Sequence, residues 1–113
     1  MAKKYRIKWA APAREDINEI IDYISQTNIN YAIKILDKIE DNVKQLDMLP
    51  ERYRIVPELE RYGYFLYREM IVDYWRIIYK IENDFVYIML IVDSRRNLED
   101  LIIKKIVLRE GEI

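Results

Sequence analysis

Residues 64–98 show a pattern of apolar and polar positions that predicts three strands joined by two tight turns. Asp73-Tyr74 would form the first turn and residues 82–84 the second, because Asn and Asp between β-branched and aromatic runs are typical of hairpin turns. Residues 85–92 are apolar without a break, too short a run to span a membrane and too continuous for a strand with one hydrated face. We therefore expect this run to be the central strand of a sheet that is covered on both faces.

The beginning of the chain, residues 3–9, alternates between polar and apolar side chains from Lys4 onward. This pattern predicts an amphipathic strand. Its polar face carries three cations, which form either a stripe that binds nucleic acid or, as we favour, the charged surface of a solvated edge strand. These cations are Lys4, Arg6 and Lys8.

Two stretches with helical spacing of apolar residues follow, separated by a short polar segment. Pro12 suits the first turn of the first helix, and Asp16 suits the positive end of that helix. Asn28 or Asn30 can cap the second helix, and Pro50 ends it. Since each helix has one apolar stripe, we expect a helical hairpin that packs on one face of the sheet.

The segment of residues 51–63 has the least regular pattern, and it mixes arginine with tyrosine. This composition is typical of surfaces that bind phosphate and stack on bases. In the alternative interpretation, a loop packs on the core through Ile55, Val56 and Leu59, and its arginines pair with acids of the same segment. The residues concerned are Arg52, Tyr53, Arg54, Arg61 and Tyr62, with Glu51, Glu58 and Glu60 as the acids.

Cations also recur within the predicted strands. Arg76 and Lys80 fall on one face of their strand, and Arg68 can reach the same neighbourhood if the hairpin pairs the end of its strand near Trp75. Glu69 falls on the opposite face from Arg68. The last strand ends in a cationic pair, after which a short C-terminal helix capped by Asn97 is expected. We therefore expect the guanidinium groups of residues 68, 76 and 95 to cluster at the open edge of the sheet.

Composition narrows the chemistry that this chain can perform. It has 113 residues and contains neither Cys nor His, so a thiolate or an imidazole cannot act as nucleophile, base or metal ligand. The formal net charge is −1 and the sequence pI is near 5.6, which argues against binding nucleic acid through bulk charge. We expect one cytoplasmic domain spanning residues 1–113, because neither a signal peptide nor a long apolar span is present.

Five segments in order resemble the RelE/ParE toxin superfamily, and the resemblance covers residues 5–101. The segments are WAAPARED (9–16), LPER (49–52), YREMIV (67–72), WRIIYKI (75–81) and VDSRRNL (92–98). The sequences of the predicted strands at residues 68–72 and 75–81 look closer to the ParE-like group that is often labelled plasmid stabilisation proteins. The expected RelE-like fold is α+β, with an N-terminal strand, a helical hairpin, a three-stranded antiparallel meander and a short C-terminal helix.

The resemblance implies the toxin of a type II toxin–antitoxin pair, which is held inactive in a hetero-oligomer by a cognate antitoxin. The RelE branch looks like a ribosome-dependent endonuclease that cuts messenger RNA, whereas the ParE branch poisons DNA gyrase and is not a nuclease. The shared fold cannot choose between these targets. A degenerate, non-toxic module that only binds antitoxin is a further alternative. No cofactor, metal or membrane is expected.

Only some of the functional residues of the superfamily have a counterpart in this sequence. Arg95 falls where RelE-like nucleases keep an arginine that stabilises charge at the scissile phosphate, and Arg76 matches a third-strand arginine that recurs across the superfamily. Glu69 stands where RelE has a basic residue, and Ile71 stands where it has a catalytic arginine. At Asp93-Ser94 many ParE-like members carry His-Gly, and the His-Tyr ending of the YoeB-like relatives is absent.

Cleavage of RNA without histidine would need a carboxylate base and arginines that stabilise charge, in a metal-independent, ribosome-dependent endoribonuclease. The candidate catalytic residues are Arg95, Arg76, Arg68 and Glu69, with Asp93 as an alternative carboxylate. The candidate substrate-binding residues are Arg52, Tyr53, Arg54, Lys80 and Arg96.

Overall fold

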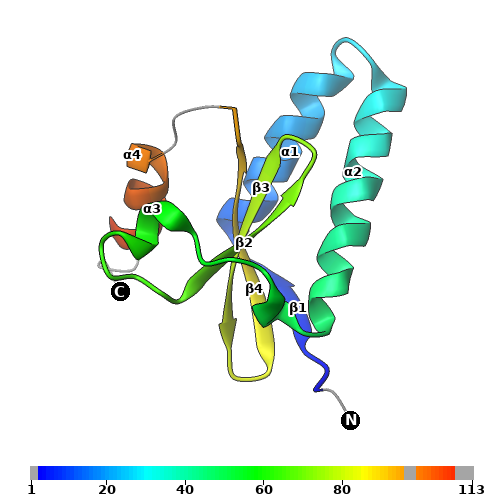
Figure 1. The fold of residues 1–113 in the computed structure, drawn as a ribbon. Helices are drawn as coiled ribbons and strands as arrows, with labels where there is room; N and C mark the ends of the chain where they lie inside the picture. The colour runs from blue at the N-terminus through cyan, green and yellow to red at the C-terminus, as the bar shows by residue number, and fades with distance from the viewer. Residues whose placement is uncertain (1–2, 96–98, 109–113) are drawn as a thin grey trace.

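The computed structural model describes residues 3–95 and 99–108. Its elements follow the predicted α+β order, as Figure 1 shows. Within the described ranges, no helix is both long and apolar enough to cross a bilayer. The elements are β1 (Arg6–Trp9), α1 (Ala11–Ser25), α2 (Ile29–Lys44), 3-10 turns at Gln45–Asp47 and Pro50–Arg52, α3 (Pro57–Glu60), β2 (Tyr67–Val72), β3 (Trp75–Glu82), β4 (Phe85–Asp93), α4 (Glu99–Ile102) and a π-helical turn at Ile103–Leu108.

The four strands form one sheet in the order β1-β4-β3-β2. The meander of β2, β3 and β4 is antiparallel as predicted, and β1 joins it as an edge strand parallel to β4. Asp73 and Asn83 lie in the two connecting turns with φ of 52° and 55°, a left-handed conformation that Asp and Asn tolerate better than most residues. The register shifts next to Ile78, where Leu90 and Ile88 of β4 pair with consecutive residues of β3.

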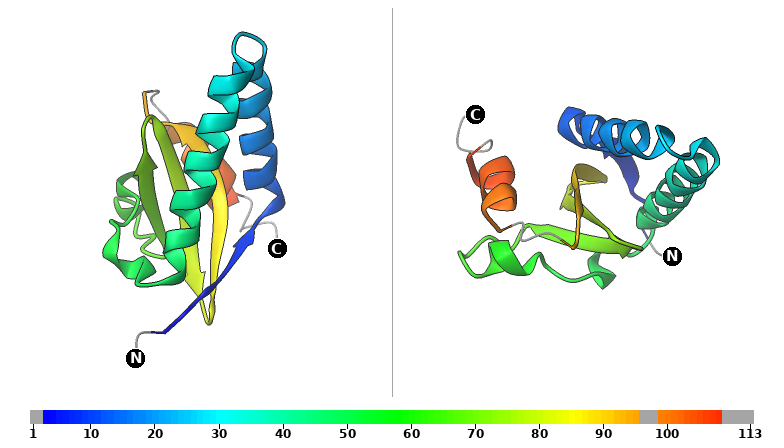
Figure 2. Two further views of the ribbon diagram at one scale, coloured as in Figure 1. Left: turned by 90° about the vertical axis from the view of Figure 1, so that its right-hand side faces the viewer. Right: turned by 90° about the horizontal axis from the view of Figure 1, so that it is seen from above.

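The helical hairpin covers one face of the sheet, as predicted (Figure 2). Asn28 caps α2, because its side chain accepts a hydrogen bond from the backbone N–H of Tyr31 at 3.0 Å. The main hydrophobic core lies between these helices and the sheet, and its fully buried centre includes Ala13, Ile39, Leu46, Ile77, Tyr79, Val86 and Ile88.

The second face of the sheet is covered by α3 and the C-terminal helix, which lie opposite the hairpin in the end-on view of Figure 2. A smaller core forms there from Leu59 of α3, Ile102 of α4 and the strand residues Tyr67, Ile78 and Leu90. Because β4 contributes side chains to both cores, it is the doubly covered central strand that the sequence predicted. Asn97, the expected cap of the last helix, lies outside the described residues.

Candidate functional site

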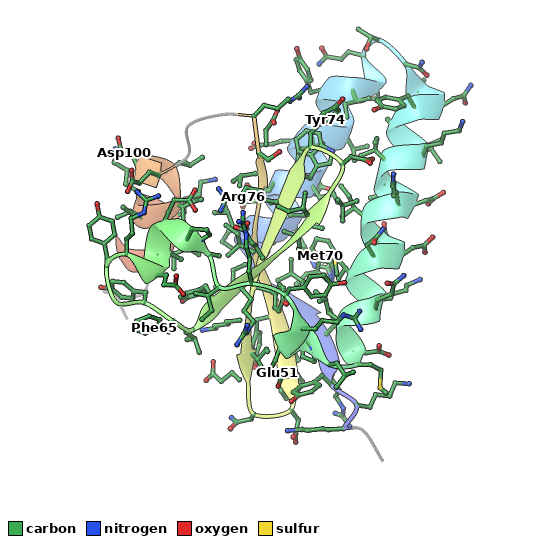
Figure 3. All side chains as sticks on the ribbon, viewed as in Figure 1. Glu51, Phe65, Met70, Tyr74, Arg76 and Asp100 are labelled. Carbon is green, nitrogen blue, oxygen red and sulfur yellow. The ribbon has the colours of Figure 1, made fainter. Side chains whose placement is uncertain are left out.

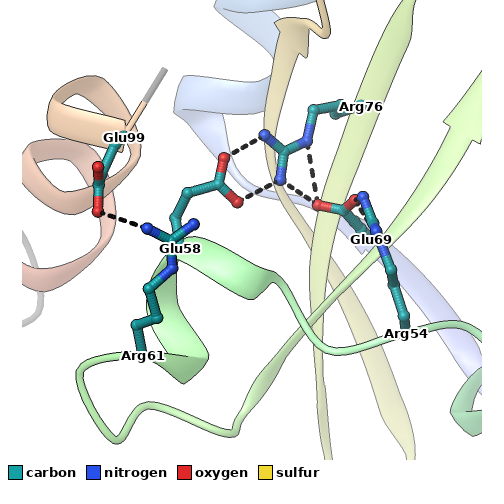
Figure 4. Close-up of polar contacts among 6 residues, drawn as sticks. All are labelled: Arg54, Glu58, Arg61, Glu69, Arg76 and Glu99. Atoms are coloured by element: carbon teal, nitrogen blue, oxygen red, sulfur yellow. Dashed lines mark hydrogen bonds and ion pairs between the residues drawn. The ribbon is translucent and has the colours of Figure 1, made fainter. Parts of the chain in front are cut away.

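A buried ion-pair network joins the second face of the sheet to the loop that covers it, as Figure 4 shows. Arg76 of β3 donates from Nη1 and Nη2 to the two carboxylate oxygens of Glu58, at 2.5 and 2.7 Å. The same guanidinium donates from Nε, at 3.0 Å, and from Nη2 to Oε1 of Glu69 on β2. Arg54 donates from Nε and Nη2 to Oε2 of Glu69, at 2.8 and 2.6 Å.

These charges are neutralised within the protein. The side chain of Glu69 is 0% exposed and that of Arg76 is 9% exposed. Hydrogen bonding by Arg76 lowers the pKa of Glu58, and the same pairing, with a further contribution from Glu69, raises the pKa of Arg76. A phosphate could bind Arg76 only by displacing a glutamate from it. Glu69 could act as a base only by giving up its hydrogen bonds from Arg54 and Arg76. The network therefore gives Glu69 and Arg76 a structural role, which is to hold the loop on the sheet.

Arg68 does not reach this network. Val72 pairs with Trp75 as expected, and this register pairs Arg68 with Tyr79 and Ile71 with Arg76. Since side chains alternate along a strand, Arg68 lies on the face covered by the helical hairpin, and Arg76 lies on the second face. Arg68 donates from Nη1 to the backbone carbonyl of Tyr53 at 2.6 Å. The expected open cluster of guanidinium groups from residues 68, 76 and 95 is therefore wrong.

The arginine-rich segment packs on the core, since Val56 and Leu59 are fully buried. Its arginines find partners, but these are not the acids that the sequence suggested. Arg54 pairs with Glu69, and Arg61 lies 3.5 Å from Glu99 in the C-terminal helix. The loop-on-core interpretation thus holds, but Arg54 and Arg61 pair with distant carboxylates, and Arg52 donates to the backbone carbonyl of Gln45.

Two further candidate substrate-binding groups are placed near this segment and the sheet. Arg52 lies over the ring of Tyr53, with its guanidinium carbon 5.0 Å from the ring centre. Lys80 lies 3.4 Å from Glu82 and 5.8 Å from the centre of the Tyr87 ring. Their contact with a substrate stays a prediction. Arg96 lies outside the described residues.

Arg95 stands at a different place, beyond the end of β4. It donates from Nε and Nη2 to the two carboxylate oxygens of Asp93, at 3.0 and 2.7 Å, and its guanidinium lies 4.3 Å from the centre of the Tyr74 ring. Figure 3 shows Tyr74 at the tip of the β2–β3 turn and Arg76 farther along the sheet. Arg95 therefore remains a surface group, held in a fixed orientation by a carboxylate and an aromatic ring.

Arg95 and Tyr74 line a cleft of about 630 Å³ between the tip of the helical hairpin, the β2–β3 turn and the C-terminal helix. Tyr23 of α1, Tyr31 of α2 and the half-buried Trp75 line the same cleft. Tyr23 is 75% exposed and Tyr74 is 50% exposed, so large aromatic surfaces face the solvent. We name this set of residues, Tyr23, Tyr31, Tyr74, Trp75 and Arg95, the tyrosine cleft.

A buried carboxylate lies in the wall of the tyrosine cleft. Asp16 of α1 accepts the backbone N–H of Ile91 at 3.0 Å and lies 3.4 Å from Nζ of Lys105. Burial raises the pKa of Asp16, although both partners oppose that shift. We expected Asp16 to interact with the positive end of its helix. Instead its carboxylate accepts a backbone N–H of the central strand β4, at a position beyond the last residue of β4 that pairs with β1.

The tyrosine cleft was not predicted from the sequence. Its tyrosines come from three elements that are distant along the chain, and the high count of ten tyrosines was its only signal. Among the described residues, no group of three or more carboxylate side chains is arranged to hold a metal ion.

The same fold is found among solved structures. One solved chain, titled "Chromosomal ParDE TA system from P. aeruginosa", superimposes with a TM-score of 0.64 at 18% sequence identity. The superposition covers 80% of the present chain and 96% of the solved chain. At this identity the likeness establishes the fold alone, the α+β fold described above.

The sequence narrows the class further. Residues 7–98 match the model of the family described as "ParE toxin of type II toxin-antitoxin system, parDE". The chain therefore belongs to the ParE toxin family. A search of the curated proteins finds no match.

Proposed function

We propose that this protein is the toxin of a type II toxin–antitoxin pair and that the free toxin arrests growth by binding DNA gyrase, without cutting messenger RNA. The observation that carries the choice of target is the closed network of Arg76, Glu69, Glu58 and Arg54. In this network Arg76 and Glu69, which were candidates for catalysis in a nuclease, are paired with other side chains of the protein.

Cleavage by attack of the 2′-hydroxyl needs a base near that hydroxyl and cationic groups at the same phosphate. In the part of the chain that the structure describes, Glu69 is buried under two arginines, and Arg68 lies on the opposite face. Arg95 stays on the surface beside Asp93. Since these groups do not converge on one exposed point, their arrangement favours action by binding over action by catalysis.

The composition of the tyrosine cleft supports a protein target. Tyr, Trp and Arg are the residues that contribute most binding energy in protein interfaces, especially where they surround a pocket. Arg95 is held between Asp93 and the Tyr74 ring, so little side-chain entropy is lost when a partner docks on it. We infer that gyrase contacts Arg95 and Tyr74, and that the antitoxin blocks this contact.

Two assays with purified protein test the proposal. Supercoiling by gyrase should be inhibited in proportion to toxin concentration, and primer extension on translating ribosomes should reveal no new cleavage sites. Arg95→Ala and Tyr74→Ala should weaken inhibition by about ten-fold or more while leaving the thermal midpoint unchanged. Lys34→Ala, which changes an exposed lysine of α2, is the matched control.

Ribosome-dependent cleavage that is lost in Arg95→Ala would replace gyrase by messenger RNA as the target. Normal growth during high soluble expression, together with tight antitoxin binding, would instead favour the degenerate module. Full inhibition of gyrase by both cleft variants would remove the tyrosine cleft from the proposal.

A further inference from the structure

The second face of the sheet is covered by helices over only part of its length. The small core with α3 and α4 ends at Tyr67, which pairs with Lys80 of β3. Beyond it, toward the β3–β4 turn, the strands continue past both helices, as Figure 1 shows. Among the described residues, α3 and α4 therefore do not cover this end of the face, where Phe85 and Tyr87 are half-buried.

The strand register defines which side chains this uncovered end presents. Tyr87 of β4 pairs with Lys80 of β3 and with Lys8 of β1, so the three form one row across the sheet. In the next row, Phe85 pairs with Glu82 and with Arg6. Paired residues point to the same side, and the alternate positions, such as Ile7 and Val86, belong to the main core on the other side. We name the set of Arg6, Lys8, Lys80, Phe85 and Tyr87 the cationic platform.

Within the cationic platform, ammonium groups lie over aromatic rings. The Nζ atom of Lys8 is 4.6 Å from the centre of the Phe85 ring, and that of Lys80 is 5.8 Å from the centre of the Tyr87 ring. The two rings are neighbours, with centres 5.7 Å apart. Arg6 and Lys8 are exposed. A carboxylate in these two rows comes from Glu82, which lies 3.4 Å from Lys80.

We propose that the cationic platform binds single-stranded nucleic acid. Binding of single strands combines aromatic rings, on which successive bases stack, with cations that follow the phosphates. Here two adjacent rings on one strand are bordered by cations on the strands to either side. Lysine stems are flexible, so both ammonium groups can leave the ring faces for phosphates while two bases take their place on Phe85 and Tyr87.

Two alternative roles for this surface predict different behaviour. Cations on an edge strand can serve only to prevent aggregation, but that role gives no reason for two aromatic rings between them. An acidic peptide would be attracted by Arg6, Lys8 and Lys80, but it would make no use of ring faces. Aromatic and cationic groups in the same two rows therefore favour a ligand that carries both phosphates and bases.

The proposal does not depend on the gyrase proposal. Tyr87 and Asp93 are six residues apart on β4, so the cationic platform lies about 20 Å from the tyrosine cleft. Variants of the platform can be scored for nucleic-acid binding and for gyrase inhibition separately. Loss of one activity with retention of the other identifies which proposal has failed.

The test is fluorescence anisotropy of the purified protein with labelled dT12 and rU12, from about 50 to 200 mM salt. Both strands should bind, with an affinity that falls as salt rises, and a blunt duplex of the same length should bind more weakly because its bases are stacked within it. Comparison of dT12 with rU12 identifies DNA or RNA as the preferred source of the strand.

Variants separate the parts of the cationic platform. Lys8→Gln should reduce the salt slope by about one, and Phe85→Leu should weaken binding at least about five-fold while leaving that slope unchanged. Glu82→Gln should tighten binding, because it removes the competing carboxylate. Lys34→Gln on α2 and Tyr62→Leu, at an exposed tyrosine beyond α3, are the matched controls and should change neither quantity.

The proposal is overturned if neither strand binds at 50 mM salt, or if the duplex binds as tightly as dT12. It is also overturned if a polyglutamate peptide competes equally well and Phe85→Leu leaves the affinity unchanged, since the surface would then attract any anion. If Phe85→Leu fails to fold, Lys8→Gln and Glu82→Gln decide the matter, because their exposed side chains can be changed without loss of packing.

Discussion

Replacement of Arg76 by methionine tests whether the buried network exists in solution. The variant keeps the volume of the side chain and removes all of its hydrogen bonds to Glu58 and Glu69. Breaking a buried ion pair by removing one partner costs about 3 to 5 kcal/mol of unfolding free energy. We expect a cost of about 3 kcal/mol, at the lower end of that range, because Glu69 keeps Arg54 and Glu58 can turn toward water.

Two matched variants locate the effect within the network. Arg54→Met removes an arm that is 63% exposed and leaves Glu69 paired with Arg76, so its cost should not exceed about 1 kcal/mol. The double variant Arg76→Met with Glu69→Met removes both buried charges. Its cost should be smaller than the sum of the two single costs, because no carboxylate is then left buried without Arg76.

Urea denaturation followed by circular dichroism at pH 7 measures these costs. The pKa of Glu58 is lowered in the folded protein, so its pairing contributes stability above the ordinary value of 4.5 and loses it as the pH falls through the folded pKa. The gap between wild type and Arg76→Met should therefore narrow in acid. A variant within about 1 kcal/mol of wild type at pH 7 would refute the network and make Arg76 a catalytic candidate again.

Substitutions at three further positions test local features of the fold by the same measurement. Asn28→Ala should cost about 1 kcal/mol, because it removes the cap on the N–H of Tyr31. Asp16→Ala should cost about 1 to 3 kcal/mol by leaving the buried N–H of Ile91 unpaired, whereas Asp16→Asn should cost less. Since the pKa of Asp16 is raised, its ionisation reduces stability as the pH rises through the folded pKa, and Asp16→Asn should abolish that decline. Gly63→Ala should cost about 1 kcal/mol or more from backbone strain at φ +85° alone, since no atom lies near the added methyl group.

Much of the fold follows from local sequence signals. Alternating residues define β1, the unbroken apolar run defines β4, and Asp73 and Asn83 mark the turns between the meander strands. These signals extend over a few residues each, so they can be recognised in the sequence without knowledge of the whole structure. The parallel pairing of β1 with β4 has no such signal, because it depends on the path that the helical hairpin takes between them.

The candidate site was harder to predict, and the reason differs between residues. The separation of Arg68 from Arg76 was implicit in the sequence, since a two-residue turn after Val72 fixes the pairing and so the face of every residue in β2. The approach of Glu58 to Arg76 was not implicit, because it depends on how an irregular loop settles on the sheet. The same holds for the tyrosine cleft, whose members meet only after the hairpin and the sheet have packed.

The network around Arg76 also explains how an irregular loop is fixed on the sheet. The loop contributes few buried apolar side chains, chiefly Val56 and Leu59. It is also attached by the hydrogen bonds that Arg54 donates to Glu69 and that Glu58 accepts from Arg76. Replacing an arginine at this place would therefore loosen the covering of the second face whether or not the toxin touches nucleic acid. Loss of toxicity in a variant of Arg76 is consequently weak support for a catalytic role, and a variant of exposed Arg95 is the sharper test.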